Sequence, residues 1–327
     1  MSCDVKIKRL TAAWLSLETV YGWGWTPDVY IPFDTFDVKP IIETDSDEAA
    51  FWRIEKTAWK DVIKTMTEIT LWGDVRDTSF WYILKWLLPN ETVVDNWDWT
   101  WSHTFSTKND NCNQSFSILD LNGIDNKYCN WAILDSLDID MSVPNAVSFS
   151  AKFKWKTLAP AWVAPTPFYN DIEKRFKSAK SSLKIANNVA WLAAATSIWF
   201  NTSKLSIWKW AMEVQEWGHQ SVDVARIYNT VQTITWDIEA LFKDAILRQY
   251  VLDWTPKAIQ FIITWENMDG EMTQFEIILD EVYFDDWGSS TDNDGFITQS
   301  VWFEAVYSRA NEKSIIMALK NSKSNAY

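Results

Sequence analysis

Most of the chain alternates between hydrophobic and polar residues with a period of two, which is typical of β-strands with one buried face. The clearest alternation occurs in six segments, at residues 62–71, 132–141, 147–154, 258–264, 275–284 and 301–307. Turn signals separate them, among them Asn122-Gly123, Pro144-Asn145, Asp269-Gly270 and Asp294-Gly295. The pattern therefore predicts a mainly β protein.

One segment with helical spacing interrupts this pattern at residues 77–88. Its hydrophobic residues fall on one stripe of a helix, at Phe80, Ile83, Leu84 and Leu87. A polar side chain at position 77, 78 or 79 can cap its start, and Pro89 ends it.

A second helix is predicted over 237–252, with a stripe at Ile238, Leu241, Phe242, Ala245 and Ile246. Its expected N-cap is Asp237, and Glu239 is favourable in the first turn. A third, more highly charged helix is weakly indicated over 170–186.

The two stronger helices indicate an internal repeat, because each follows a strand and precedes strands that contain Ile-Leu-Asp. Phe80 and Phe242 are 162 positions apart, whereas Asp135 and Asp280 are 145 apart, so loop lengths differ between the halves. We therefore predict tandem, duplicated β-sandwich or β-barrel domains, each with one flanking α-helix. The expected boundaries are 1–157 for the first domain, 158–190 for a linker that can include a helix, and 191–327 for the second domain. Pro and Ala are frequent at 158–167, which favours a linker there.

The segment 94–105, VDNWDWTWSHTF, has the pattern of a hairpin whose turn carries Trp where the backbone favours Gly. Tight hairpin turns need a positive φ, which Gly adopts without steric cost. Similar positions recur in Gly22-Trp23-Gly24-Trp25, Leu71-Trp72-Gly73-Asp74, Asp253-Trp254-Thr255-Pro256 and Thr264-Trp265-Glu266-Asn267. Each becomes an ordinary turn or strand break if Trp is replaced by Gly.

The composition shows the same anomaly across the whole chain. There are 8 Gly and 24 Trp among 327 residues, whereas average usage gives about 23 Gly in a chain of this length. Some bacteria and their viruses translate the stop codon UGA as Gly, and conceptual translation with another codon table writes Trp. We therefore hypothesise that many of these residues are Gly in the living source. The alternative takes the Trp side chains at face value, as stacking platforms of a carbohydrate-binding β-sandwich.

The formal net charge of −14 argues against a surface that grips nucleic acid, but it does not exclude a surface that avoids binding DNA, since like charge repels it. We expect no membrane span, because no apolar run reaches the necessary length, and no signal peptide. The three cysteines, Cys3, Cys112 and Cys129, suggest a reducing compartment. A Cys112–Cys129 disulfide remains an open alternative.

The two histidines, His103 and His219, have no Ser, Cys or metal-ligand partner at a useful spacing. We expect His103 to be a half-exposed strand residue. Because no phosphate-binding Gly-rich loop is present either, we predict no catalytic, cofactor-binding or metal-binding residues and conclude that the protein is not an enzyme.

Two acidic features match known kinds of site only in part. A calcium loop centred on Gly295 would have Val301 at its twelfth position instead of Glu, so a solvated hairpin turn is predicted over 285–295. Asp135 and Asp138 could serve as a glycosidase pair, which stays a weak alternative because sequence spacing does not fix their separation.

The order of these features resembles the tail tube (major tail) proteins of tailed bacteriophages. With Trp read as Gly, LETVYGWGWTPDVYIPF is similar to the family's N-terminal arm, turn and first strand. The strand VIKTMTEITLWGDV with the helix TSFWYILKWLL, the hairpin DNWDWTWSHTF, and WAILDSLDIDMSVPNAVSFSAKFKWK resemble the segments that follow. The resemblance spans most of the chain and lies in order and spacing rather than in a single motif.

The resemblance implies a structural virion protein that self-assembles into stacked rings, forming the tail tube through which DNA is delivered into the host. If both halves are tube domains, either three chains form one pseudo-sixfold ring or six two-domain chains form a ring. Implied partners are further copies of the chain, the tape measure protein, the tail terminator and the baseplate or tail-tip proteins. DNA passes through the lumen without specific binding, and no membrane or cofactor is involved. The implied location is the virion tail, after assembly in the host cytoplasm.

Overall fold

The computed structural model describes residues 12–18, 29–48, 59–108, 115–121, 125–156, 158–160, 166, 169, 173–215, 224, 226–266, 272–290 and 296–323. These residues form a mainly β structure with three α-helices. The sheets are open and do not close into a barrel, which corrects the barrel alternative.

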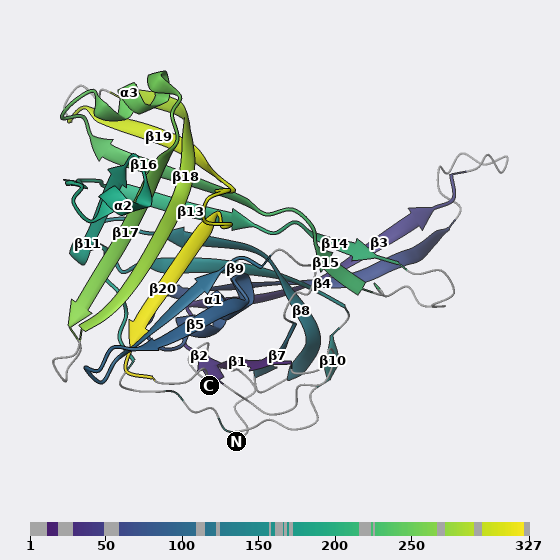
Figure 1. Cartoon of the computed structure of the whole chain (residues 1–327). Coiled ribbons are helices and arrows are strands. Elements are labelled where there is room, and N and C mark those ends of the chain that lie inside the picture. Colours follow the sequence, from purple (N-terminus) through teal and green to yellow (C-terminus); the bar gives the residue numbers. More distant parts are fainter. Residues whose placement is uncertain are drawn as a thin grey trace.

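One layer is a continuous sheet made of two sets of four strands (Figure 1). In the first set the order is β3 (Thr35–Ser46), β4 (Lys60–Asp74), β9 (Ser148–Trp155) and the C-terminal half of β8 (Lys127–Asp140). In the second set it is β13 (Thr202–Trp208), β16 (Thr233–Leu241), β19 (Thr298–Val306) and the C-terminal half of β18 (Met272–Ser290). The two sets meet where β8 pairs with β13.

The remaining strands also form two similar sets. The first runs β2 (Val29–Ile31), β1 (Ala12–Leu17), β7 (Phe116–Leu121), the N-terminal half of β8, and β10 (Ala159–Pro160). The second runs β12 (Ser197–Ile198), β11 (Ser181–Ala186), β17 (Lys257–Glu266), the N-terminal half of β18, and β20 (Ile315–Asn321). The hairpin of β5 (Asn90–Asp95) and β6 (Trp101–Ser106) extends the second set, because β6 pairs with β20.

The pairing registers repeat as well as the strand order. The β3–β4 pair Thr35–Trp72 corresponds to the β13–β16 pair Thr202–Glu239, because both partners are offset along the chain by the same amount. In the same way, the β8–β9 pair Asp140–Ser148 corresponds to the β18–β19 pair Ser290–Thr298. The β-bulges also correspond, because the β8–β9 register skips position 135 and the β18–β19 register skips position 285. The two sets of strands therefore agree in ladder register at these pairs and in the position of one β-bulge.

The first predicted helix is confirmed as α1 (Phe80–Leu87), and all four residues of its predicted stripe are buried. Its predicted cap is wrong, because no side chain at 77–79 makes the capping hydrogen bond. Instead, the Glu173 carboxylate accepts the backbone N–H of Ser79 from a distant segment.

The second helix begins later than predicted, as α3 (Ile246–Asp253). Asp237, its expected cap, lies inside strand β16, opposite Lys204 and Trp302. In this strand Ile234, Trp236, Ile238 and Ala240 are buried in alternation. Ladder hydrogen bonds on both sides of the strand outweigh the helical stripe, which overlapped this alternation by chance.

The third predicted helix is wrong. Within 170–186 the described residues form a short 3-10 turn at Ser178–Lys180 and then strand β11, which pairs with β17 of the second half. The remaining short helix is α2 (Val189–Leu192). Most of the Pro- and Ala-rich stretch 158–167 lies outside the described residues.

The six predicted strands are confirmed within β4, β8, β9, β17, β18 and β19. The proposed correspondence between Asp135 and Asp280 is wrong, because the bulge register aligns Asp135 with Asp285. Phe242 is likewise not the counterpart of Phe80, since it precedes α3 and is partly exposed. The offset that relates Thr35 to Thr202 instead places Leu247, which is buried in α3, at the position of Phe80.

Candidate functional site

The joint between the two sets of strands is the first candidate site, because β8 and β13 pair edge to edge there and make one continuous sheet. Five residue pairs connect β8 and β13, from Asp140–Lys204 to Ser136–Trp208. The Lys204 ammonium lies 3.6 Å from the Asp138 carboxylate across this seam. Further backbone hydrogen bonds, such as Met141 N–H to the Ser203 carbonyl at 2.8 Å, extend the contact.

Asp135 anchors the end of the joint from the β-bulge in β8. Its carbonyl accepts the Lys209 N–H at 2.7 Å, and its carboxylate accepts the Ala211 N–H at 2.8 Å. It also lies 3.7 Å from the Lys154 ammonium. Bulges re-aim a side chain at the end of a ladder, and here the bulge aims a carboxylate at the neighbouring unit.

The outer strands of the joined sheet leave two long edges. Among the described residues, β3 pairs with β4 alone, and residues 286–290 of β18 pair with β19 alone. Asp285, the counterpart of Asp135, is exposed at the second edge. Such edges expose backbone donors and acceptors that favour pairing with another chain.

The face of the joined sheet that points away from the hydrophobic core is polar. One cross-strand row that defines this face runs from Lys204 through Asp237 to Trp302. Acidic residues outnumber lysines there: the acids are Asp37, Glu68, Asp74, Asp138, Asp140, Asp237, Glu239, Asp286 and Glu304, and the lysines are Lys39, Lys152, Lys154 and Lys204.

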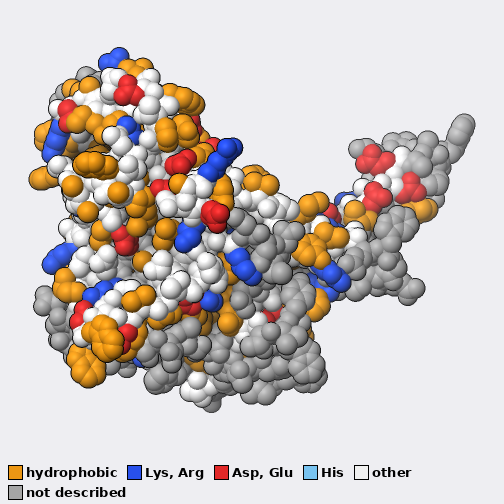
Figure 2. Space-filling model, in the orientation of Figure 1, with side chains coloured by type: hydrophobic (Ala, Val, Ile, Leu, Met, Phe, Trp, Pro, Cys, Tyr) orange, Lys and Arg blue, Asp and Glu red, His pale blue; other side chains and the backbone are white. Residues whose placement is uncertain are grey.

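An arm projects from the body where β3 and β4 extend beyond the sheet (Figure 1). The short hairpin of β14 (Ala211–Val214) and β15 (Arg226–Asn229) lies beside its base, where Lys64 bridges Glu43 and Glu213 at 2.9 Å each. Figure 2 shows hydrophobic and acidic side chains on the described part of the arm. The exposed hydrophobic residues are Ile42, Trp59, Val62 and Ile63.

Within the described ranges, Trp occupies most of the left-handed backbone positions that are not Gly. Among the described residues six have positive φ, of which one is Glu312 and the others are Trp97, Trp99, Trp131, Trp210 and Trp254. Trp97 and Trp99 lie in the β5–β6 turn, and Trp254 ends α3. Trp72 and Trp265, in contrast, lie within β4 and β17, so the predicted turns at these two positions are wrong. Gly22 to Trp25 lie outside the described residues.

His103 is fully buried in β6, which corrects the expected half-exposed position. Its Nδ1 lies 2.9 Å from the Glu91 carboxylate and its Nε2 lies 2.9 Å from the Lys323 carbonyl. Hydrogen bonds from His103, Lys85 and Trp81 lower the pKa of Glu91 against the opposing effect of burial, which is the largest single contribution. The group fixes the β5–β6 hairpin against α1 and the chain end. His219 lies outside the described residues.

The remaining acidic and thiol candidates lie at separate places in the described part of the chain. Asp135 and Asp138 both act at the joint, each beside a lysine, so they do not form an isolated carboxylate pair. The hairpin turn predicted over 285–295 is wrong for residues 285–290, which belong to strand β18, while 291–295 lie outside the described residues. No group of three or more described His, Cys, Asp and Glu residues is arranged to hold a metal ion. Cys129 is buried as a free thiol, and Cys3 and Cys112 are not described.

Two buried carboxylates meet at the start of α1. The Asp77 carboxylate accepts the Lys174 N–H at 3.0 Å, and Glu173 accepts the Ser79 N–H. Burial, with a further contribution from the charge of Glu173, raises the pKa of Asp77 to about 6. Burial also raises the pKa of Glu173.

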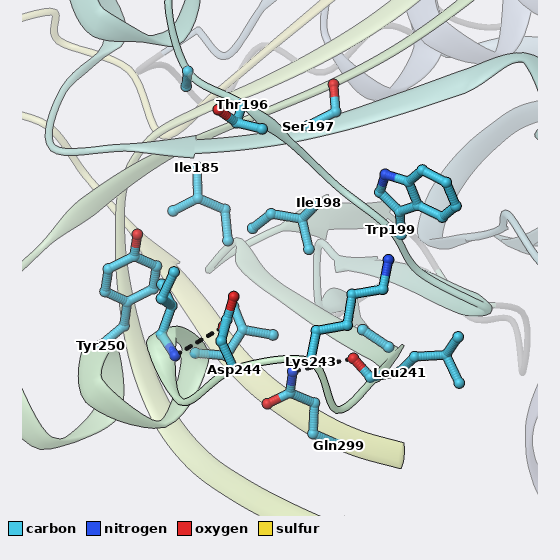
Figure 3. A pocket seen from close by; sticks show the side chains of 14 residues that line it. Ile185, Thr196, Ser197, Ile198, Trp199, Leu241, Lys243, Asp244, Tyr250 and Gln299 are labelled. Carbon is cyan, nitrogen blue, oxygen red and sulfur yellow. Dashed lines mark hydrogen bonds between the residues drawn. The ribbon is translucent and has the colours of Figure 1, made fainter. Parts of the chain in front are cut away.

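A pocket of about 450 Å³ lies between α3, β12 and the end of β16 (Figure 3). Its lining combines apolar side chains such as Ile185 and Leu247 with polar ones such as Thr196. The Lys243 ammonium lies 4.0 Å from the centre of the Trp199 ring. Asp244 accepts the Ile246 N–H at 3.1 Å, so it serves the start of α3.

The sequence did not predict strand β3, at the outer edge of the joined sheet, or strand β13, which forms the joint with β8. Both alternate, with Phe36 and Val38 directed to the core in β3, and Leu205 and Ile207 in β13. Pro40 in β3 and three short polar residues in β13 weaken this signal.

No protein-family model and no curated protein matches the chain. None of the described helices is long and apolar enough to span a membrane.

Proposed function

We propose that the protein is a structural subunit that assembles into rings, and that these rings stack into the tail tube of a bacteriophage. In this role it is the wall of the conduit for DNA and has no catalytic activity. The observation that carries the proposal is the joint between β8 and β13, where one half of the chain extends the sheet of an equivalent half.

The repeated registers support an origin by duplication. Strand order, ladder register and bulge position agree between the halves, whereas few residues are identical. A contact that joins the end of one unit to the start of the next is heterologous, and such contacts form closed rings when their rotation closes. In the proposed ring, the joint corresponds to one step between neighbouring positions.

The polar face supports the conduit role. Both α1 and α3 contain residues of the hydrophobic core, so this core lies on one side of the joined sheet and the polar face on the other. If the polar face lines the lumen, its excess of acidic side chains repels the phosphate backbone, so that DNA can pass without binding.

The arm supports contacts between rings. Its exposed residues Ile42, Val62 and Ile63 lie outside the body of the protein, where a neighbouring ring can bury them. Burial of such side chains supplies favourable free energy at roughly 25 cal/mol per Å².

The carbohydrate-binding alternative finds less support. Stacking platforms for a sugar would lie together on one face, but Trp97 and Trp99 lie on the β5–β6 turn and Trp254 lies at the end of α3. These elements occupy opposite ends of the molecule (Figure 1).

Negative-stain electron microscopy of the purified chain, concentrated at neutral pH, tests the proposal. We expect rings or hollow tubes, together with large species in analytical ultracentrifugation. A protein that stays a monomer at high concentration and forms no rings contradicts the proposal. Binding on a glycan array would then favour the alternative.

A further inference from the structure

The two unpaired edges of the joined sheet belong to strands that correspond to the two strands of the joint. In the joint, the C-terminal half of β8 receives β13. The repeat makes β18 the counterpart of β8, because the pair Ser290–Thr298 matches Asp140–Ser148. It likewise makes β3 the counterpart of β13, through the matching ladders of β3–β4 and β13–β16. Both of these counterpart edges are unpaired among the described residues.

We propose that the free edge of β18 in one chain pairs with β3 of a second copy, antiparallel and in the register of the β8–β13 joint. Asp140–Lys204 of the joint then corresponds to Ser290 opposite Asp37 of the next chain, and Asp138–Ser206 to Gly288 opposite Lys39. This interface rests on the proposed ring assembly and names its contact.

Asp285 supports this pairing most directly. The two equivalent bulges carry the same residue, although few other positions agree. Asp135 uses its bulge to accept the Ala211 N–H of the neighbouring half. Asp285 is exposed, and in the proposed register its carboxylate meets the N–H of Thr44 in the second chain.

The charges at the new seam also match. In the joint, Asp138 contacts Lys204 diagonally, since Lys204 lies opposite Asp140. In the proposed register Lys39 lies opposite Gly288, so Asp286 has the same diagonal relation to Lys39. Among the described residues neither Lys39 nor Asp286 forms an ion pair within the chain.

Each chain therefore fills two positions of its ring. The ring then alternates between the covalently linked joint and the proposed interface between chains.

Disulfide trapping tests this register. The double variant Asp37→Cys/Ser290→Cys, made with Cys3→Ser and Cys112→Ser, is oxidised after assembly. We expect covalent oligomers on a non-reducing gel, because opposite residues of antiparallel strands have Cα separations that suit a disulfide. Asp140→Cys/Lys204→Cys is the matched control, and it should form the corresponding bond within one chain.

The variant Asp37→Cys/Asp286→Cys places the two thiols out of register and should remain uncrosslinked. Rings that form a disulfide only in this variant, or in neither variant, overturn the proposed register while leaving ring assembly intact. The absence of rings for the unsubstituted chain contradicts the proposed function instead. A ladder of covalent oligomers from the in-register pair alone supports both.

A second inference rests independently on the backbone. We infer that the native residues at positions 97, 99, 131, 210 and 254 are glycines. In the described part of the chain these five Trp positions have φ between 44° and 71°, a region that Gly adopts freely and bulky residues rarely enter.

The local structure at four of the five sites is one that favours Gly. Trp254 is the left-handed residue that ends α3, where Gly is the commonest choice. Trp131 lies where the β7–β8 register shifts, and a left-handed Gly is typical of one class of β-bulge. Trp97 and Trp99 lie in a hairpin turn.

Peptide mass spectrometry of the protein from its natural particle tests this inference. Sequencing of the gene shows which codon stands at each of the five positions. We expect the mass of Gly at the five positions and UGA in the gene. Glycine at a majority of the five positions supports the inference, and Trp at a majority, encoded by UGG, overturns it.

Discussion

Replacing exposed left-handed Trp residues by Gly should make this protein more stable. Trp97, Trp99 and Trp254 suit the test because their side chains are 90%, 81% and 60% exposed. Their removal therefore costs little buried surface. For Trp254 the main loss is a ring contact with Tyr283 at 6.0 Å between centroids.

The expected gain follows from the backbone. A left-handed conformation costs an L-residue about 1–2 kcal/mol. Gly removes this cost but gains roughly 0.5–1 kcal/mol of conformational freedom in the unfolded chain. The net gain is about 0.5–1 kcal/mol at each position, so the triple variant should gain about 2 kcal/mol if the effects add.

The assay is urea denaturation of the recombinant chain at low concentration, followed by far-UV circular dichroism because the substitutions change Trp fluorescence. Trp72→Gly and Trp191→Gly are matched controls, since both side chains are substantially exposed but lie in β4 and α2 without a positive φ. Each control should lose about 1 kcal/mol, because Gly weakens strand and helix interiors. A triple variant that loses stability as the controls do would refute the reasoning.

Three further outcomes are expected. Asp77→Asn should stabilise the protein by about 2 kcal/mol at pH 8, because burial raises the pKa of Asp77 to about 6 and the folded state is penalised once the group ionises. This advantage should shrink as pH falls from 6 towards 4, and equal stability of the two proteins at pH 8 in urea titrations contradicts it. Asp285→Ala should weaken ring assembly by at least tenfold in sedimentation experiments without changing monomer stability, whereas undiminished assembly argues against the bulge contact. Lys39→Asp should weaken assembly and Lys39→Asp/Asp286→Lys should restore it, while failure of the double variant to recover excludes the proposed ion pair.

The sequence revealed strands more reliably than helices, for a physical reason visible in β16. A period-two pattern on a strand of the continuous sheet is reinforced by ladders on both sides, as at Asp237. The helical stripe that began there had no such support, and the helix forms only after the strand ends. In α1 the stripe was sufficient, because its residues pack into the core.

The candidate site could not be predicted from sequence because its chemistry belongs mainly to the backbone. A seam of five residue pairs is specified by register, and register depends on bulges at Asp135 and Asp285 that no local sequence pattern marks. The repeat was detectable only as a similar order of elements, and the apparent Ile-Leu-Asp match selected the wrong partner. The Trp-for-Gly anomaly, in contrast, was visible in the sequence because backbone conformation constrains residue type directly. Hence the sequence identified positions where the backbone needs a positive φ. The pairing between two copies could be proposed only once the structure showed which strand edges are unpaired.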